Sequence, residues 1–182
     1  MTTIPPYTRP PRRLAHIALR TNQLERMVAW YGCVLGTRIA YASDKVAFLT
    51  YDEEHHRIAL LAMDDYPARP EQGAVGHVHT AFAYDSLDEL MGTYVRLKAQ
   101  SILPRRSIHH GPTVSLYYAD PDGNQIELQV DSFPDAESAN AWMRSAAFSR
   151  NPIGIEFDPE AMLVRMGSGE PEADLLRRPD GV

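Results

Sequence analysis

Residues 14–19 (LAHIAL) and 77–82 (HVHTAF) each place a histidine two positions before an alanine, inside a short apolar stretch typical of a β-strand. His16 and His79 are 63 positions apart. The same offset pairs Leu24 with Leu87, Tyr31 with Tyr94 and Ile39 with Ile102. A fixed offset of this kind indicates an internal repeat, so the chain is predicted to contain two copies of one structural unit.

Each copy has the pattern of a strand, a helix and three further strands. In the first copy we predict a strand at 14–19, a helix at 24–35 closed by Gly36, and strands near 37–42, 46–51 and 57–62. In the second we predict a strand at 75–83, a helix at 86–100 with Ser86 as its N-cap, and strands near 102–108, 114–119 and 124–130. Asp122-Gly123 would form the last hairpin turn. The predicted fold is α+β, built from two tandem βαβββ modules.

Three regions follow from this pattern. Residues 1–13 form an N-terminal arm, and residues 14–131 form the catalytic domain, with modules at about 14–63 and 75–131. Residues 132–182 form a C-terminal helix and tail that pack on or near the site. Within this last region we expect a helix at 135–148 capped by Asp135 or Ser132, an extended apolar segment within 151–166, and a loose chain from Gly167 onward.

Composition indicates one globular domain with a real core. The chain has 182 residues, of which 44% are hydrophobic and 23% charged. Its net charge of -6 and its lack of a basic run argue against a nucleic-acid partner. No apolar stretch approaches the roughly 20 residues that span a membrane, and the N-terminus lacks the pattern of a secretory signal. The single cysteine, Cys33, suits a reducing compartment and a place in the core, so we expect a cytoplasmic protein.

A third stretch, residues 120–128 (DPDGNQIEL), supplies a carboxylate that complements the two histidines. Glu127 lies between Ile126 and Leu128, where a carboxylate is costly unless it is paired or bound to metal; the alternative is a solvent-facing residue. Two histidines and one carboxylate are the ligand set of non-haem iron enzymes that use dioxygen. His77 shares the strand face of His79 and is the alternative ligand, but only His79 has the sequence context of His16.

Residues 108–127 (IHHGPTVSLYYADPDGNQIE) resemble the signature of extradiol ring-cleaving dioxygenases, in the vicinal-oxygen-chelate superfamily of paired βαβββ modules. The looser module resemblance covers residues 12–131, and the chain length is that of a one-domain member. The resemblance implies a pseudo-twofold open barrel around a metal site, with His16, His79 and Glu127 as ligands of Fe(II), or of Mn(II) as the alternative. Ala59 aligns with Glu127 in the first module and cannot act as a fourth ligand.

The same resemblance implies three catalytic residues. His56 matches the acid–base histidine, with adjacent His55 as the alternative. His110 matches the signature histidine, with His109 as the alternative. Tyr117 would hydrogen-bond a substrate oxygen, while Tyr118 would face the other way. The intervening hairpin turn prevents sequence parity from fixing the direction of Tyr117 relative to Glu127.

We therefore expect extradiol cleavage of a small aromatic diol with dioxygen. Biphenyl-2,3-diol or another 3-substituted catechol is the expected substrate. Two other classes compete: a different metal enzyme of the superfamily, such as a glyoxalase or a fosfomycin-type thiol transferase, and a metal-free binding module of the bleomycin-resistance kind. Ala59 disfavours the glyoxalase, the Leu116-Tyr117 pair with His110 disfavours the transferase, and the full ligand set disfavours the binding module. A homo-oligomer is expected, because small modules of this kind commonly pair.

Overall fold

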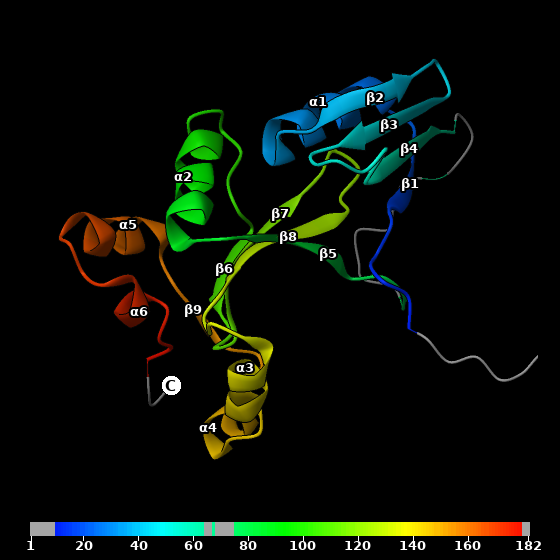
Figure 1. Ribbon diagram of the computed structural model, residues 1–182. Helices are drawn as coiled ribbons and strands as arrows, with labels where there is room; N and C mark the ends of the chain where they lie inside the picture. The colour runs from blue at the N-terminus through cyan, green and yellow to red at the C-terminus, as the bar shows by residue number, and fades with distance from the viewer. Residues whose placement is uncertain (1–9, 64–66, 68–74, 180–182) are drawn as a thin grey trace, which may run out of the picture. The chain divides into compact units, whose positions relative to one another are not determined.

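Two compact units make up the chain, Met1–Pro67 and Ala68–Val182, each with its own sheet and helices (Figure 1). The computed structural model describes residues 10–63, 67 and 75–179. Most of the predicted arm, residues 1–9, lies outside the described residues, as does the link at 64–66 and 68–74.

The first unit is one complete βαβββ module. Its elements are β1 (Ile17–Thr21), α1 (Leu24–Leu35), β2 (Arg38–Ala42), β3 (Val46–Thr50) and β4 (Ile58–Ala62). The sheet order is β1-β4-β3-β2, with β1 parallel to β4 and the other pairs antiparallel. Helix α1 ends at Gly36, whose φ of 65° suits a residue without a Cβ, and the module core lies between this helix and the sheet.

The second unit repeats this module and extends it. Its repeat elements are β5 (His79–Tyr84), α2 (Leu87–Lys98), β6 (Arg106–His109), β7 (Thr113–Ala119) and β8 (Gln125–Asp131). The sheet order is β5-β8-β7-β6-β9, again with the first and last repeat strands parallel. Ser86 caps α2 by accepting a hydrogen bond from the Glu89 amide, as predicted. The prediction of two tandem βαβββ modules is confirmed; a common barrel stays a prediction.

Strand register identifies the equivalent positions of the two modules. In the first, Ala18 of β1 is paired with Ala59 of β4. In the second, Ala81 of β5 is paired with Glu127 of β8. Because Ala18 and Ala81 are related by the repeat offset, Ala59 and Glu127 occupy equivalent places, as the sequence alignment predicted. At this position the second module carries a carboxylate and the first module carries an alanine.

The C-terminal region is more ordered than predicted. The expected helix at 135–148 is two helices, α3 (Ala136–Met143) and α4 (Ala146–Arg150), because Ser145 caps the start of the second. Asp135 caps α3, as predicted. The extended segment forms strand β9 (Ile155–Glu156), which pairs with β6, and then ends at helix α5 (Pro159–Gly167), capped by Asp158.

The prediction of a loose chain after Gly167 is wrong. Helix α6 (Glu172–Leu175) follows, and Leu175 is only 3% exposed. Arg165 forms an ion pair with Glu170 across the end of α5, which holds the turn between the two helices. Composition suggested disorder because the segment is rich in glycine, proline and charge, but a single apolar anchor and paired charges are enough to order it. Within the described ranges no helix is both long enough and apolar enough to cross a membrane.

Candidate functional site

The centre of the candidate site is the carboxylate of Glu127, which is nearly buried. Its side chain is only 7% exposed, and its strand neighbours Ile126 and Leu128 are buried in the core. Glu127 lies on the opposite face of β8 from these two neighbours, because strand side chains alternate. A buried carboxylate needs partners, so the side chains around it define the site.

His79 and Tyr117 supply those partners from the strands on either side. Strand β8 lies between β5 and β7. Nε2 of His79 lies 2.9 Å from one carboxylate oxygen of Glu127. The hydroxyl of Tyr117 donates to the other oxygen at 2.9 Å. Tyr117 is paired with Glu127 in the antiparallel register, which settles the direction that sequence parity left open.

The Tyr117 phenol is held in its neutral form. Burial, with the negative charge of Glu127 and the hydrogen bond to it, raises the pKa of Tyr117 well above its usual range. A phenol with a raised pKa remains a hydrogen-bond donor at neutral pH. Tyr118, on the opposite strand face, is fully buried. It contributes to the core of the unit rather than to the group around Glu127.

His110 extends this group by one hydrogen bond. Its Nε2 lies 2.8 Å from the hydroxyl of Tyr117 and 3.8 Å from Glu127. Its other ring nitrogen, Nδ1, contacts the backbone carbonyl of Ile153. A carbonyl can only accept, so Nδ1 carries a proton and Nε2 faces the phenol. The C-terminal segment thereby adds a second contact to a histidine whose other nitrogen is already held by Tyr117.

His109, the alternative to His110, has a structural place instead. It is 2% exposed, and its Nδ1 accepts a hydrogen bond from the Gly111 amide. Nearby, Arg178 donates to the carbonyls of His110, Asn151 and Ala147 and lies over the ring of Trp142. The tail therefore holds the backbone of the His109–His110 pair in place. Burial lowers the pKa of His109 to about 4, with further lowering from nearby positive charges.

This lowered pKa predicts a loss of stability in mild acid. Below pH 6.5 the unfolded chain protonates His109 while the folded chain does not, so folding stability should fall as pH drops toward about 4. The contribution is on the order of 3 kcal/mol. Urea unfolding of the metal-free protein at a series of pH values would measure it. His109→Asn, which retains an acceptor, should flatten the slope, whereas His55→Asn should not. Equal slopes in all three proteins would contradict the prediction.

In the first unit, His16 and His56 lie together. His16 directly precedes β1 and is exposed, and its ring centroid lies 4.4 Å from that of His56. His56 also stacks on Phe48 of β3, with centroids 4.8 Å apart and ring planes 27° apart. His55, the alternative to His56, is 72% exposed at its side chain and contacts Glu54. The structure thus brings His56, and not the surface-exposed His55, against both an aromatic wall and a predicted ligand.

The environment of His56 favours its neutral form. Desolvation lowers the pKa of His56, and the positive charges that His16 and His55 can carry lower it further, against an opposing effect of Glu54. A histidine with a lowered pKa is unprotonated near neutral pH. It can therefore accept a proton, which is what an acid–base residue must do first.

The described donor groups suit a metal such as Fe(II). No three histidine, cysteine, aspartate or glutamate side chains are grouped closely enough to hold an ion anywhere in residues 10–63, 67 and 75–179. The second unit nevertheless places an imidazole nitrogen and a buried carboxylate oxygen 2.9 Å apart, which is part of a nitrogen-and-oxygen ligand set. The rival ligand His77 is exposed and contacts Thr80 instead.

Sequence reasoning missed the groups that support these side chains. The Ile153 carbonyl and Arg178 hold the strand of His110, and Arg57 binds the backbone beside His16. Arg57 could have been noticed from the sequence, because it is a charged residue immediately before the buried strand β4. The contact of the Ile153 carbonyl with His110 could not be recognised from the sequence, since every residue has a backbone carbonyl.

A scan against protein-family models gives one match that covers most of the chain. The glyoxalase/bleomycin resistance protein/dioxygenase superfamily model matches residues 13–128. This range spans both modules and ends one residue after Glu127. It excludes the C-terminal region, which includes the Ile153 and Arg178 contacts.

Curated relatives extend the similarity into that region. Biphenyl-2,3-diol 1,2-dioxygenase 2 of Rhodococcus globerulus is 41% identical, over 87% of this chain and 84% of its own. Biphenyl-2,3-diol 1,2-dioxygenase 3 of the same organism is 42% identical, over 91% and 88%. Among solved structures, a lactoylglutathione lyase from Agrobacterium tumefaciens aligns with a TM-score of 0.54 and 25% identity, over 67% of this chain and 96% of its own. The family match and the two Rhodococcus relatives confirm the predicted resemblance to ring-cleaving dioxygenases.

Proposed function

Because the chain belongs to the glyoxalase/bleomycin resistance protein/dioxygenase superfamily, we propose that it is an extradiol dioxygenase using Fe(II) and dioxygen. The observation that carries this proposal is the group around Glu127, in which a buried carboxylate contacts a histidine and a neutral phenol on adjacent strands. A metal-free binding module has no need of a buried carboxylate paired with an imidazole. The proposed substrate is biphenyl-2,3-diol or another 3-substituted catechol, in keeping with the names of the two Rhodococcus relatives.

The proposed metal ligands are His16, His79 and Glu127. His79 and Glu127 already contact each other, and His16 is the repeat equivalent of His79. When bound, Fe(II) would supply a Lewis-acidic centre with open positions for the two diol oxygens and dioxygen, and Mn(II) is the alternative ion. Ala59, equivalent to Glu127, leaves the first module without a carboxylate at this place.

The remaining residues act on protons and on the position of the substrate. His56, unprotonated near neutral pH, would take a proton from a diol hydroxyl and return it as the ring opens. Tyr117 is neutral and has one hydroxyl proton, which it donates to Glu127; once Glu127 binds the metal, that proton would instead be available to a substrate oxygen as negative charge develops on it. His110, oriented by the contact of Nδ1 with the Ile153 carbonyl, would keep its Nε2 beside the phenol oxygen. Phe48 would contribute an aromatic surface beside His56.

The lyase fold match makes glyoxalase activity the second candidate. Ala59 argues against it, because a glyoxalase-like site would usually use a fourth protein ligand at the position equivalent to Glu127. The protein, loaded with Fe(II), Ni(II) or Zn(II), should not isomerise the hemithioacetal of methylglyoxal and glutathione. Turnover of that substrate, without oxygen uptake on a catechol panel, would favour the lyase.

The direct test of the proposal is reconstitution with Fe(II) without oxygen, followed by mixing with a diol and air. Oxygen uptake should accompany formation of a product that absorbs in the near-UV or visible, because cleavage beside the two hydroxyls leaves a conjugated dienoate. The resting protein should be nearly colourless, since Tyr117 is not among the proposed iron ligands. A red-brown resting protein, or a muconate product from cleavage between the hydroxyls, would overturn the extradiol assignment.

Tyr117→Phe should retain iron but lower kcat/KM for the diol. The variant removes one preorganised donor to developing negative charge, which typically costs about 10²-fold or more. Tyr118→Phe is a matched control, because that hydroxyl is buried on the other strand face and has no hydrogen-bond partner among the described residues. Steady-state kinetics with iron quantified in each preparation would make the comparison. Equal losses in the two variants would remove Tyr117 from the mechanism.

A further inference from the structure

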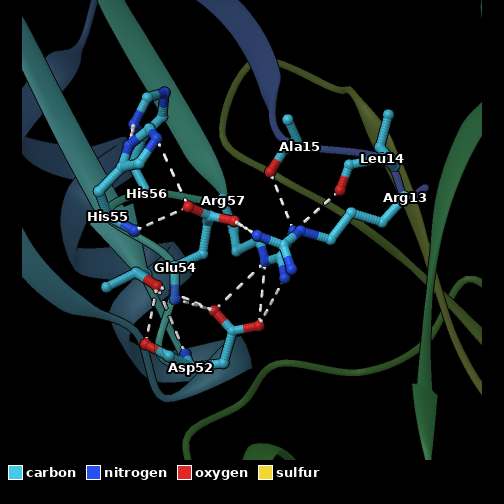
Figure 2. Close-up of polar contacts among 9 residues, drawn as sticks. Arg13, Leu14, Ala15, Asp52, Glu54, His55, His56 and Arg57 are labelled. Carbon is cyan, nitrogen blue, oxygen red and sulfur yellow. Dashed lines mark hydrogen bonds and ion pairs between the residues drawn. The ribbon is translucent and has the colours of Figure 1, made fainter. Parts of the chain in front are cut away.

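Arg57 joins the two parts of the chain that carry His16 and His56. Its Nη1 donates to the carbonyl of Leu14 at 2.8 Å and to that of Ala15 at 3.1 Å (Figure 2). Both carbonyls belong to the two residues immediately before His16. Arg57 itself immediately follows His56 and precedes β4. The Arg57 side chain therefore links the segment that precedes His16 to strand β4, which begins two residues after His56.

The backbone of Arg57 completes this attachment from the other side. The amide of Ile17, the residue after His16, donates to the carbonyl of Arg57 at 3.0 Å. The peptide groups that flank His16 are thus both bonded to Arg57, one through its side chain and one through its main chain. The Arg57 amide in turn donates to the carbonyl of Leu49 at 2.8 Å, which fixes it to β3. The backbone of an otherwise exposed His16 is held at both ends.

The guanidinium is itself held by a carboxylate. Nε and Nη2 of Arg57 donate to Asp52 at 3.0 and 2.9 Å, a two-point contact that fixes the plane of the group. The side chain of Arg57 is only 17% exposed. Asp52 also accepts from the Glu54 amide at 3.1 Å and lies within hydrogen-bond distance of the Thr50 hydroxyl. These hydrogen bonds, chiefly the one from Arg57, hold the pKa of Asp52 below its usual range, so the pair stays charged at neutral pH.

We propose that Arg57, held by Asp52, is a positioning residue that fixes His16 relative to His56 and so prepares His16 to bind the metal. The inference rests on the proposed function, because it takes His16 as a ligand. Arg57 touches neither substrate nor metal in this role; it acts through the backbone of Leu14, Ala15 and Ile17. A ligand held by its backbone loses less freedom on binding, and loss of such support typically weakens metal affinity by about 10- to 100-fold.

The test compares the Fe(II) dissociation constants of variants, measured without oxygen by competition with a coloured chelator. Arg57→Gln removes the charge and the planar fork and should weaken Fe(II) binding by about tenfold or more. Arg57→Lys can still donate to one carbonyl but cannot make the two-point contact, so it should restore affinity in part. Asp52→Asn leaves Arg57 in place with a weaker partner and should give a smaller loss. If Arg57→Gln does not fold, the other two variants carry the test.

Arg165→Gln is the matched control. It removes another part-buried arginine–carboxylate pair, with Glu170, in the second unit. Thermal unfolding of the metal-free proteins should show a loss of stability for both Arg165→Gln and Arg57→Gln, smaller for the more exposed Arg165, while only Arg57→Gln weakens Fe(II) binding. A fall in melting temperature with unchanged Fe(II) affinity in Arg57→Gln would show a merely structural role and overturn the proposal.

The outcomes separate the two proposals. A wild-type protein that binds Fe(II) but cleaves no diol would reject the proposed function, while the dependence of affinity on Arg57 would still support the positioning role. A wild-type protein that cleaves diols, with Fe(II) binding insensitive to Arg57, would reject the positioning role alone. The kcat/KM of each variant that is active but impaired can also be measured with saturating Fe(II). If saturating Fe(II) returns this kcat/KM to the wild-type value, this would further support action through the metal site.

Discussion

Replacing His79 by alanine is expected to give a folded protein that no longer retains Fe(II) and has no measurable ring-cleaving activity. His79 contributes one of the proposed ligands and is also the imidazole in contact with Glu127, so its removal leaves a buried carboxylate without that partner. The same loss is expected for His16→Ala and Glu127→Ala. Iron content after gel filtration without oxygen, together with circular dichroism, would measure metal loss and folding separately.

His77→Ala is the matched control for this experiment. His77 lies two residues earlier, is exposed and contacts Thr80. This variant should keep its iron and its activity. Full iron content in His79→Ala, with loss in His77→Ala, would reverse the assignment of the ligand.

Replacing His56 by phenylalanine is expected to slow turnover by roughly 10²–10⁴-fold, the usual effect of losing a general acid–base group. The substituted ring can still stack on Phe48, so the aromatic wall is largely preserved. Fe(II) content and diol binding, the latter measured without oxygen, should be little changed. The loss should therefore appear in kcat rather than in binding.

His55→Phe controls for the introduction of a ring at this turn. Its side chain is 72% exposed and its ring contacts that of His56 rather than the Phe48 wall, so turnover should change little. Near-normal turnover in His56→Phe would remove this histidine from the mechanism. A comparable loss in both variants would instead show that the turn tolerates neither substitution.

Repetition made most of the fold predictable. The offset of 63 residues located both histidine strands and both helices, and α1 has the bounds that its apolar period predicted. Strand ends were less accurate: β1 begins at Ile17 rather than Leu14, because the carbonyls of Leu14 and Ala15 are bonded to Arg57 instead of to a neighbouring strand. Local sequence carries no information about such a long-range partner.

The candidate site was predictable where residue type itself indicates chemistry. His79, Glu127, His110 and Tyr117 form one group of polar contacts, on or directly beside strands that the repeat and the signature predicted. Supporting groups were not predictable. The contact of Ile153 with His110 depends on the position of a backbone carbonyl in a segment outside the repeat.

The pairing of β9 with β6 bears on where the functional unit of this chain ends. The family match stops at residue 128, three residues before the end of β8. A protein trimmed to that boundary would lose the end of β8, the edge strand β9 that pairs with β6, the carbonyl that contacts His110, and Arg178. The family match and the support of His110 therefore have different boundaries, because groups beyond residue 128 contact that histidine and its backbone.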